Sequence, residues 1–445
     1  MKEIIKLEQK TPMWHFQADT AGCVLRATEV KPKLDRFLRT KEKLDKSWFV
    51  KDREDALDYK LWFVAPDKGP SELNGKHYPL FFGNMGGEQQ KKLIFYNGEI
   101  KMYLFSLNDA LIKCIKRHLF EFFATHSFGT RQDKGFGFFF PVDIDGEKGD
   151  FNQPFGAHYQ FEYRWMDYGK KFQDPAKRPP YSSWEYSYVE AFKAIHYFHK
   201  LIRSGINEGK CYYKSLMYFY AQDKGKQWDK PTIRHHFQFY TKVYQSICGQ
   251  LKPPYQEIIP RRNRQPEVKV YYRREDMVKE FSAVDSESKL LFRDTLGLAS
   301  EQQWKAYKDS ISIKAQDSGF VRFKSPILYR PVILEKEGKC HVYIHWDESG
   351  LSKLKDQCFT ISHKGENRPE VERQQDEIAP LTEMHVYEDF SLEDYFTFIS
   401  NYYKKVRKKT VYLRGGEWKN FYIEQIFSPN QENFSTVKTP NTPKP

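Results

Sequence analysis

The spacing of apolar and polar residues along the first 145 positions predicts strands alternating with amphipathic helices. Strand-like segments alternate apolar and polar side chains, whereas helical segments repeat apolar residues every three or four positions. We expect a strand at 3–10, a helix at 25–38, a strand at 60–65, two strands within 93–105, a helix at 108–123 and a strand at 136–142.

Local signals mark the ends of these elements. Pro12 ends the first strand because proline cannot donate to a strand ladder, and Pro32 predicts that the first helix starts or kinks there. Asn97-Gly98 is a hairpin signal, and Asn108 is a favourable N-cap for the second helix. The order strand, helix, two strands, helix, strand is that of a ferredoxin-like split βαβ domain.

The second half of the chain repeats this order with long interruptions. We expect a strand at 155–165, a helix at 183–202, two strands within 320–346 around Glu337-Gly338, a helix at 391–403 capped by Ser391 and a closing strand at 417–427. Insertions at about 205–315 and 347–390 form either helical subdomains or disordered loops, and the Pro-rich tail 428–445 is expected to be disordered. The predicted fold is α+β. It has one ferredoxin-like (RRM-like) domain at 1–150 and a second at 151–427, with a largely helical insertion in the second.

Charge and composition indicate which kinds of partner the chain can bind. The chain carries 72 Lys and Arg against 59 Asp and Glu, a formal charge of +13, which favours a polyanionic partner. Aromatic residues make up 17%, and rings beside cations suit unpaired bases, although we expect most rings to lie in the core. Without a long apolar run we expect no membrane partner and a cytoplasmic location. The six cysteines form no close pair, so we expect no metal and no cofactor.

The segment Phe128 to Phe140 joins a glycine-rich loop to an aromatic strand. Gly129, Gly135 and Gly137 allow positive φ and a close approach of main-chain N–H groups to a phosphodiester, while Arg131 and Lys134 supply charge. The segment is therefore interpreted as a clamp on a nucleic-acid backbone. The competing interpretation is an ordinary tight hairpin with solvated charges.

Three segments carry a resemblance to a known family. Gly129 to Gly137 looks like the glycine-rich loop after the second helix in the RAMP (Cas7-like) superfamily of CRISPR-associated RNA-binding proteins. Lys10 to Phe16 followed by Leu25 to Lys31 is similar to that family's first strand, turn and helix entry, and Arg322 to Leu328 to a strand opening in larger members. Within the superfamily the chain is most similar to the first-numbered Cmr subunits of type III-B effector complexes. Trp14 to Asp19 departs from the small-residue turn of many relatives.

This resemblance implies a non-catalytic RNA-binding subunit of a Cmr ribonucleoprotein in antiviral defence. Such a subunit holds the 3′ part of the guide (CRISPR) RNA and the paired target RNA, next to other RAMP subunits. The residues expected to bind RNA are Arg26, Lys31, Lys33, Arg36, Gly129, Arg131, Lys134, Gly135, Gly137, Arg261, Arg262, Arg264, Arg322 and Lys324.

Candidate catalytic residues are few. Asp19 is the only acid between Glu8 and Glu29, whereas two-metal cleavage normally needs several carboxylates. His15 and His126 lie near ends of predicted elements, and a histidine can act as general acid or base in metal-independent RNA cleavage. The leading hypothesis is therefore non-catalytic. An endoribonuclease that processes CRISPR repeat RNA is the alternative, and a protein-interaction scaffold with incidental charge is a third hypothesis.

Overall fold

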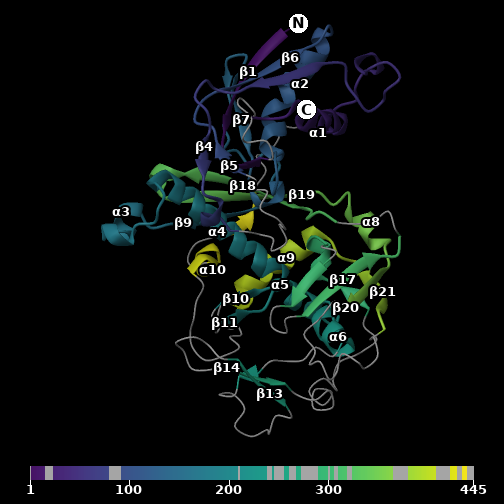
Figure 1. The fold of residues 1–445 in the computed structure, drawn as a ribbon. Coiled ribbons are helices and arrows are strands. Elements are labelled where there is room, and N and C mark those ends of the chain that lie inside the picture. Colours follow the sequence, from purple (N-terminus) through teal and green to yellow (C-terminus); the bar gives the residue numbers. More distant parts are fainter. Residues whose placement is uncertain are drawn as a thin grey trace.

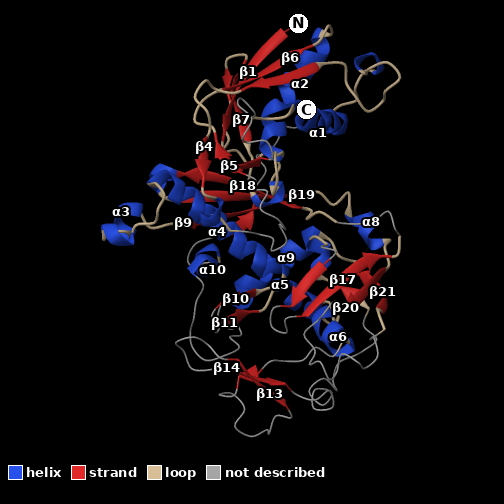
Figure 2. Cartoon of the chain, in the orientation of Figure 1, coloured by secondary structure: helices blue, strands red, loops and turns tan. Residues whose placement is uncertain are grey.

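The structure is a computed structural model of a mixed α+β protein (Figures 1 and 2). It describes residues 2–15, 24–79, 92–208, 211–237, 243–244, 255–259, 267–271, 289–298, 301–304, 309–317, 323–363, 379–406, 421–427 and 433–437. An N-terminal unit with β1 (Lys2–Gln9), β6 (Ile100–Phe105), α1 (Ala27–Lys41) and α2 (Asp109–Thr125) lies at the top of Figure 1, and the elements from α4 (Ser183–Arg203) to α10 (Phe421–Ile426) lie below it. None of the helices in these ranges is long and apolar enough to cross a membrane.

The N-terminal unit is built on a five-stranded antiparallel sheet in the order β3-β6-β1-β7-β8. Two helices, α1 (Ala27–Lys41) and α2 (Asp109–Thr125), supply the apolar side chains that pack against one face of this sheet. The strands are β1 (Lys2–Gln9), β3 (Lys60–Val64), β6 (Ile100–Phe105), β7 (Phe139–Ile144) and β8 (Glu147–Lys148). Strand β1 shows why one face of the sheet is covered. Ile5 and Leu7 are buried under the helices, whereas the alternate residues Ile4, Lys6 and Glu8 are exposed.

The predicted helix signals are partly confirmed. Asn108 caps α2, since its Oδ1 accepts a hydrogen bond from Leu111 N at 3.0 Å. Pro32 does not start α1, which begins at Ala27 and includes the proline. The Asn97-Gly98 turn is also not a hairpin. Strand β5 (Lys92–Phe95) before the turn pairs with β2 (Met13–His15) and β4 (Ser71–Leu73) in a separate small sheet, whereas β6 after it joins the main sheet.

The second unit has a four-stranded antiparallel sheet in the order β18-β19-β9-β22. Its strands are β9 (Tyr159–Arg164), β18 (Ile327–Leu334), β19 (Lys339–Trp346) and β22 (Phe434–Thr436), and α4 (Ser183–Arg203) packs on it. The closing strand is therefore β22, within the segment predicted to be disordered. The predicted closing strand at 417–427 instead contains the helix α10 (Phe421–Ile426).

The sequence predicted a largely helical insertion, but the described residues of the two insertions are more often in strands than in helices. They combine in a five-stranded sheet of order β15-β21-β20-β17-β16, formed by β15 (Leu290–Leu291), β16 (Glu301–Trp304), β17 (Asp309–Ala315), β20 (Phe359–His363) and β21 (Leu381–Val386). The remaining strands pair in small sheets: β10 (Ile206–Glu208) with β11 (Cys211–Tyr213), and β12 (Val243–Tyr244) with β14 (Glu267–Tyr271) and β13 (Tyr255–Ile259). The remaining α-helices of the described residues are α3 (Tyr168–Lys171), α5 (Leu216–Asp223), α6 (Asp229–His236), α8 (Leu351–Lys355) and α9 (Leu392–Val406).

Apolar packing joins the N-terminal unit to the second unit. Val332 of β18 and Tyr343 of β19 are buried in the same hydrophobic cluster as the N-terminal helices. Phe136, from the glycine-rich loop, stacks on Phe192 of α4 with ring centroids 4.0 Å apart. The loop therefore lies at the junction of the two units.

Candidate nucleic-acid interface

The glycine-rich loop has the backbone conformation that its sequence predicts. Gly129, Gly135 and Gly137 have φ values of +83°, +92° and +77°, and Arg131 has φ +60°. A short 3₁₀ turn, η3 (Gln132–Lys134), lies between the left-handed residues Arg131 and Gly135. Glycine avoids the steric cost that a Cβ incurs in this region.

What the glycines approach is the protein itself. A Cβ on Gly137 would lie 1.9 Å from the carbonyl oxygen of Phe128, and one on Gly135 would lie 3.0 Å from Cδ of Pro331 in β18. The N–H of Gly137 donates to Pro12 O at 2.9 Å. Gly137 thus packs against Phe128 at the start of the loop, and Gly135 packs against β18, so protein atoms fill the space that a Cβ would need at both positions.

Lys134 is likewise turned inward, contrary to the clamp interpretation. It is 2% exposed, and its Nζ lies 3.0 Å from Asp133 Oδ2 and donates to His199 Nε2 at 3.0 Å. Burial lowers the pKa of Lys134, and the nearby carboxylate of Asp133 opposes this. Lys134 is therefore an internal cation between the loop and α4.

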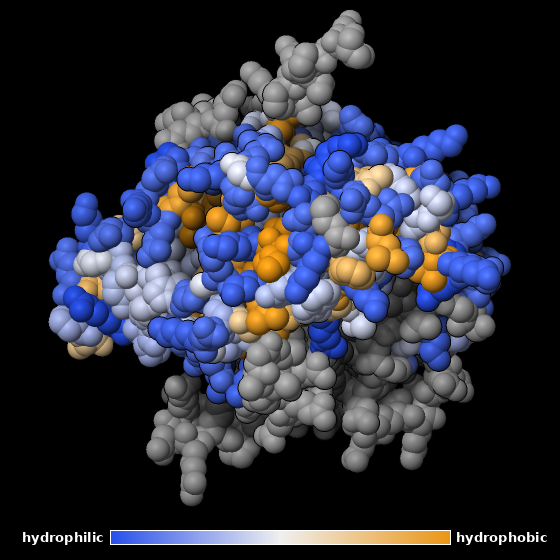
Figure 3. Space-filling view, turned by 90° about the horizontal axis from the view of Figure 1, so that it is seen from above, coloured by the Kyte–Doolittle hydropathy of each residue, from blue (hydrophilic) through white to orange (hydrophobic). Residues whose placement is uncertain are grey.

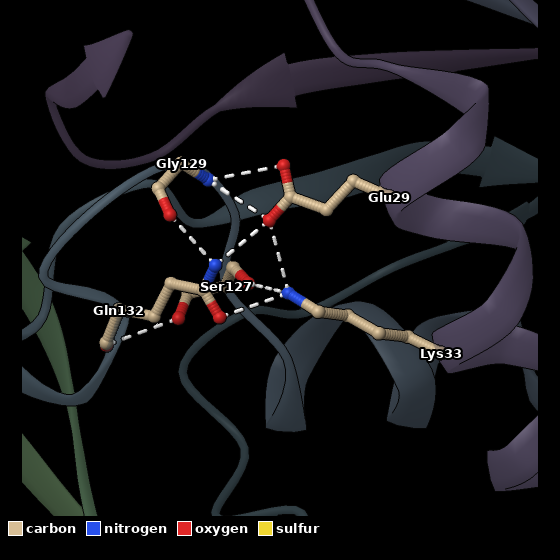
Figure 4. A network of polar contacts seen from close by, with 5 residues as sticks. All are labelled: Glu29, Lys33, Ser127, Gly129 and Gln132. Atoms are coloured by element: carbon tan, nitrogen blue, oxygen red, sulfur yellow. Dashed lines mark hydrogen bonds and ion pairs between the residues drawn. The ribbon is translucent and has the colours of Figure 1, made fainter. Parts of the chain in front are cut away.

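A polar network around Glu29 occupies the other end of the loop (Figure 4). The carboxylate of Glu29 accepts hydrogen bonds from Gly129 N at 3.1 Å and Gln132 Nε2 at 2.7 Å, and forms an ion pair with Lys33 at 3.1 Å. Lys33 Nζ also donates to Ser127 O and Gln132 Oε1, both at 2.9 Å. The anion held by this end of the loop is thus the chain's own carboxylate.

A cavity of about 350 Å³ opens beside this network. It lies at the start of α1, between that helix, β2 and the loop. Its lining residues are Met13, Val24, Leu25, Arg26, Thr28, Glu29 and Gly129. The adjacent Arg131 lies over the Trp14 ring, with its guanidinium carbon 4.6 Å from the ring centroid.

Basic side chains from distant parts of the sequence come together around Lys33 and His126. Arg26, Lys33 and Arg36 follow one another at helical spacing along one side of α1. Burial lowers the pKa of Lys33, the ion pair with Glu29 opposes this, and the charge on Lys324 adds to the lowering. Arg36 and Lys324 are both exposed. The structure therefore places Lys324, which precedes β18, near the cations of α1.

Lys31 is not part of this group. Its Nζ forms an ion pair with Asp35 at 2.8 Å, donates to Leu57 O at 2.8 Å and lies 4.1 Å from the centroid of the Tyr59 ring. These contacts fix the side chain on another side of α1. The structure thus places Lys31 apart from Lys33, and its predicted role in RNA binding stays a prediction.

His126 lies close to the basic group. Burial lowers its pKa to about 4, and the charges of Lys33, Lys324 and Arg36 contribute to the lowering. Its Nδ1 lies 3.0 Å from Phe122 O, the geometry of an Nδ1–H donor. The ring is therefore neutral at physiological pH and a weak general base.

Other sequence candidates lie outside the described residues. This applies to Asp19, Arg261, Arg262, Arg264 and Arg322, and to the side chain of His15, whose backbone ends β2. Sequence reasoning also missed the role of Glu29. The signal was present, because Glu29 precedes Lys33 by one helical turn and shares its side of α1.

One cluster has the residue types of a metal site. Ligand atoms of Glu42, Cys114 and His118 lie within 4.8 Å of one another, and these residue types can bind zinc. However, Glu42 Oε1 already accepts from Arg117 Nη1 at 2.7 Å and lies 2.8 Å from His118 Nε2. Burial raises the pKa of the Cys114 thiol to about 11. The cluster is a charge-paired contact between the end of α1 and α2.

The fold and this basic surface define an α+β protein with cations gathered at the junction of its two units. Family models agree over almost the whole chain: the Cmr1 N-terminal domain matches residues 1–206 and the Cmr1 C-terminal domain matches residues 212–421. The chain belongs to the Cmr1 family, whose members are subunits of type III-B CRISPR Cmr complexes.

Two further comparisons concern solved structures and curated proteins. Among solved structures the chain is similar to Cmr1 from Pyrococcus furiosus in its apo form, with 13% identity, 90% of this chain and 96% of that chain covered, and a TM-score of 0.30. No curated protein matches the chain. The family assignment therefore rests on the two domain models.

Proposed function

We propose that the chain is a non-catalytic RNA-binding subunit of a Cmr effector complex. In this proposal it holds the 3′ part of the guide RNA together with the paired target RNA, beside other RAMP subunits. Membership of the Cmr1 family and the formal charge of +13 support the proposal. Sequence specificity would come from base pairing with the guide, so this subunit needs to hold mainly phosphates and sugars.

The observation that carries the proposal is the convergence of Arg36 and Lys324. They come from positions 288 residues apart in the sequence (324 minus 36), and both are exposed. Within the described part of the chain, neither forms an ion pair with a carboxylate. Both charges lower the pKa of His126, so they lie on the same part of the surface, and a polyanion that neutralises both would bind favourably there.

The order of elements supports two ferredoxin-like units in this subunit. In the first, β1, α1, β3, β6, α2 and β7 follow one another along the chain, and the sheet order β3-β6-β1-β7 is that of a split βαβ arrangement. In the second, the order β18-β19-β9-β22 repeats it. The proposed RNA site then lies where the two units meet.

A role without catalysis agrees with the state of His126. A base with a pKa near 4 gains little driving force for removing a proton from a ribose hydroxyl at neutral pH. The alternative, an endoribonuclease of repeat RNA, predicts cleavage by the isolated chain in chelator. Incubation of the chain with labelled repeat RNA in EDTA should leave the RNA intact, and discrete products would favour the alternative.

The direct test compares two double variants of the full chain. Arg36→Ala with Lys324→Ala removes the convergent cations, whereas Lys51→Ala with Lys336→Ala removes two exposed lysines elsewhere. Fluorescence anisotropy with labelled single-stranded RNA should show roughly tenfold weaker binding for the first variant and a salt slope smaller by about 1.4, because each single-strand contact contributes about 0.7. Equal affinity and slope in both variants would contradict the proposed site.

A further inference from the structure

The open face of the N-terminal sheet carries an unusual set of exposed apolar side chains. Ile4 is 54% exposed, Trp62 38%, Val64 44% and Phe105 36%. They lie on the face opposite to α1 and α2, because the alternate residues of the same strands are buried under those helices. The end of the molecule that carries this unit shows apolar surface among hydrophilic surface (Figure 3).

Strand register arranges this face in rows. The central row runs Trp62, Tyr103 and Ile4 across β3, β6 and β1. The rings of Trp62 and Tyr103 are parallel within 4°, with centroids 5.0 Å apart. Since β3 is the edge strand of the sheet, Trp62 ends this stack, and a further flat ring could continue it there.

The two flanking rows contribute lysines. In one row, Lys60 and Lys2 lie on either side of Phe105. In the row on the other side of the central one, Lys101 and Lys6 are register partners on neighbouring strands. Lys2 Nζ lies 5.0 Å from the centroid of the Tyr103 ring and 5.7 Å from that of Trp62.

Acidic residues balance only some of these charges. Glu99 pairs with Lys6 at 2.9 Å, and Glu8 pairs with Lys10 at 2.7 Å. Among the described residues, Lys60 and Lys101 form no ion pair. The face thus combines stacked aromatic rings with excess positive charge.

We propose that this sheet face, defined by Trp62, Tyr103, Lys2, Lys60 and Lys101, is a second RNA-binding surface that stacks unpaired bases. Rings accept bases of any sequence while lysines follow the backbone, which is how single-stranded nucleic acid is held without sequence preference. The charge of the face favours RNA over a protein partner. This proposal rests on the proposed RNA-binding function and adds a surface on the other side of the sheet from Arg36.

The test measures binding of the full chain to a labelled 15-nucleotide oligouridine and to an RNA duplex by anisotropy. Trp62→Ala with Tyr103→Ala should weaken oligouridine binding about 5- to 150-fold, because stacking contributes roughly 1–3 kcal/mol per base. Duplex binding should change little, since its bases are already stacked. Trp62→Phe with Tyr103→Phe keeps both rings and should bind within about twofold of the original chain. Met166→Ala, an exposed apolar residue of the second half, is the control and should have no effect.

The remaining outcomes separate this surface from the site at Arg36 and Lys324. The second surface would be overturned if a folded Trp62→Ala, Tyr103→Ala variant bound RNA with wild-type affinity. Weak binding by the Arg36→Ala, Lys324→Ala variant would at the same time leave the proposed function intact. Unchanged RNA binding with failure to join the other Cmr subunits would make the face a protein-docking surface and also overturn the proposal. No oligouridine binding by the wild-type chain would contradict both proposals. Thermal melting of each variant identifies any that fail to fold. If the alanine pair does not fold, Lys60→Ala with Lys101→Ala replaces it, and this variant should bind oligouridine more weakly and with a smaller salt slope.

Discussion

Gly137→Ala tests whether the glycine-rich loop is a structural joint or a phosphate clamp. Gly146→Ala is the matched control, since Gly146 also has positive φ, +87° against +77°, but has no atom within 4 Å of an added Cβ. Both substitutions incur about 1–2 kcal/mol for a left-handed Cβ-bearing residue. Only Gly137→Ala adds a clash, with its Cβ 1.9 Å from the carbonyl oxygen of Phe128.

Relief of that clash requires a backbone shift of more than 1 Å, taking about 3 Å as the closest approach real Cβ atoms make. The shift would break the hydrogen bonds from Gly137 N to Pro12 O and from Phe128 N to Gly137 O, both 2.9 Å. Counting one buried group left unsatisfied for each of the two hydrogen bonds, each costs about 1–3 kcal/mol. The total for Gly137→Ala is therefore about 3–8 kcal/mol, against about 1–2 kcal/mol for Gly146→Ala.

Thermal melting followed by circular dichroism measures this difference. We expect Gly137→Ala to melt far below Gly146→Ala, and to bind RNA normally at temperatures where it remains folded. Equal melting temperatures with RNA binding lost only in Gly137→Ala would refute the structural role and restore the clamp.

Three further predictions concern titratable side chains of α1, the glycine-rich loop and the helices packed against them. Lys134→Met should lower the free energy of unfolding by roughly 3–5 kcal/mol, because it leaves the Asp133 carboxylate without its cation. The double variant with Asp133→Asn should regain part of this loss. Chemical denaturation of both variants measures the difference. Stability should fall as the pH is lowered from 6.5 to 4, because burial lowers the pKa of His126 and His196 to about 4. In this pH range the unfolded chain binds protons that the folded chain does not. A melting temperature that stays constant across the range would count against this prediction. Glu29→Gln should strengthen RNA binding about two- to fivefold at low salt, because it removes a negative charge beside the cavity, and weaker binding in an anisotropy titration would contradict this.

Much of the N-terminal fold could be predicted because its signals are local. The alternation in β1 and the N-cap at Asn108 depend on neighbouring residues, and both are found in the structure. Pairing between strands is not local. Asn97-Gly98 has a turn sequence, but β5 and β6 join different sheets. The sheet that each strand joins depends on its distant partner, which is β2 for β5 and β1 for β6.

The closing strand of the second unit shows the same limit. Strand β22 is three residues long, and its pairing with β9 bridges about 270 positions of sequence. Such a short segment has no periodicity of its own. The apolar residues of 421–426 fit a strand or a helix equally well, and packing against α4 selects the helix α10.

At the candidate site, helical spacing was informative but incomplete. Lys31 and Asp35 are four residues apart, a spacing that predicts the ion pair that removes Lys31 from the group. The burial of Lys134 was not predictable from its neighbours, because its partner His199 lies on α4, 65 residues away. Lys324 was a candidate by resemblance alone, and only the tertiary fold brings it to Lys33.

The central claim, that RNA lies across α1 and the segment before β18, is tested most directly by photocrosslinking in an assembled Cmr complex. Guide and target RNA carrying 4-thiouridine are irradiated, and crosslinked peptides are identified by mass spectrometry. The account predicts crosslinks in the peptides that contain Arg36 and Lys324, and none at the buried Lys134. Crosslinks at residues 134–137 with none near Arg36 and Lys324 would contradict it.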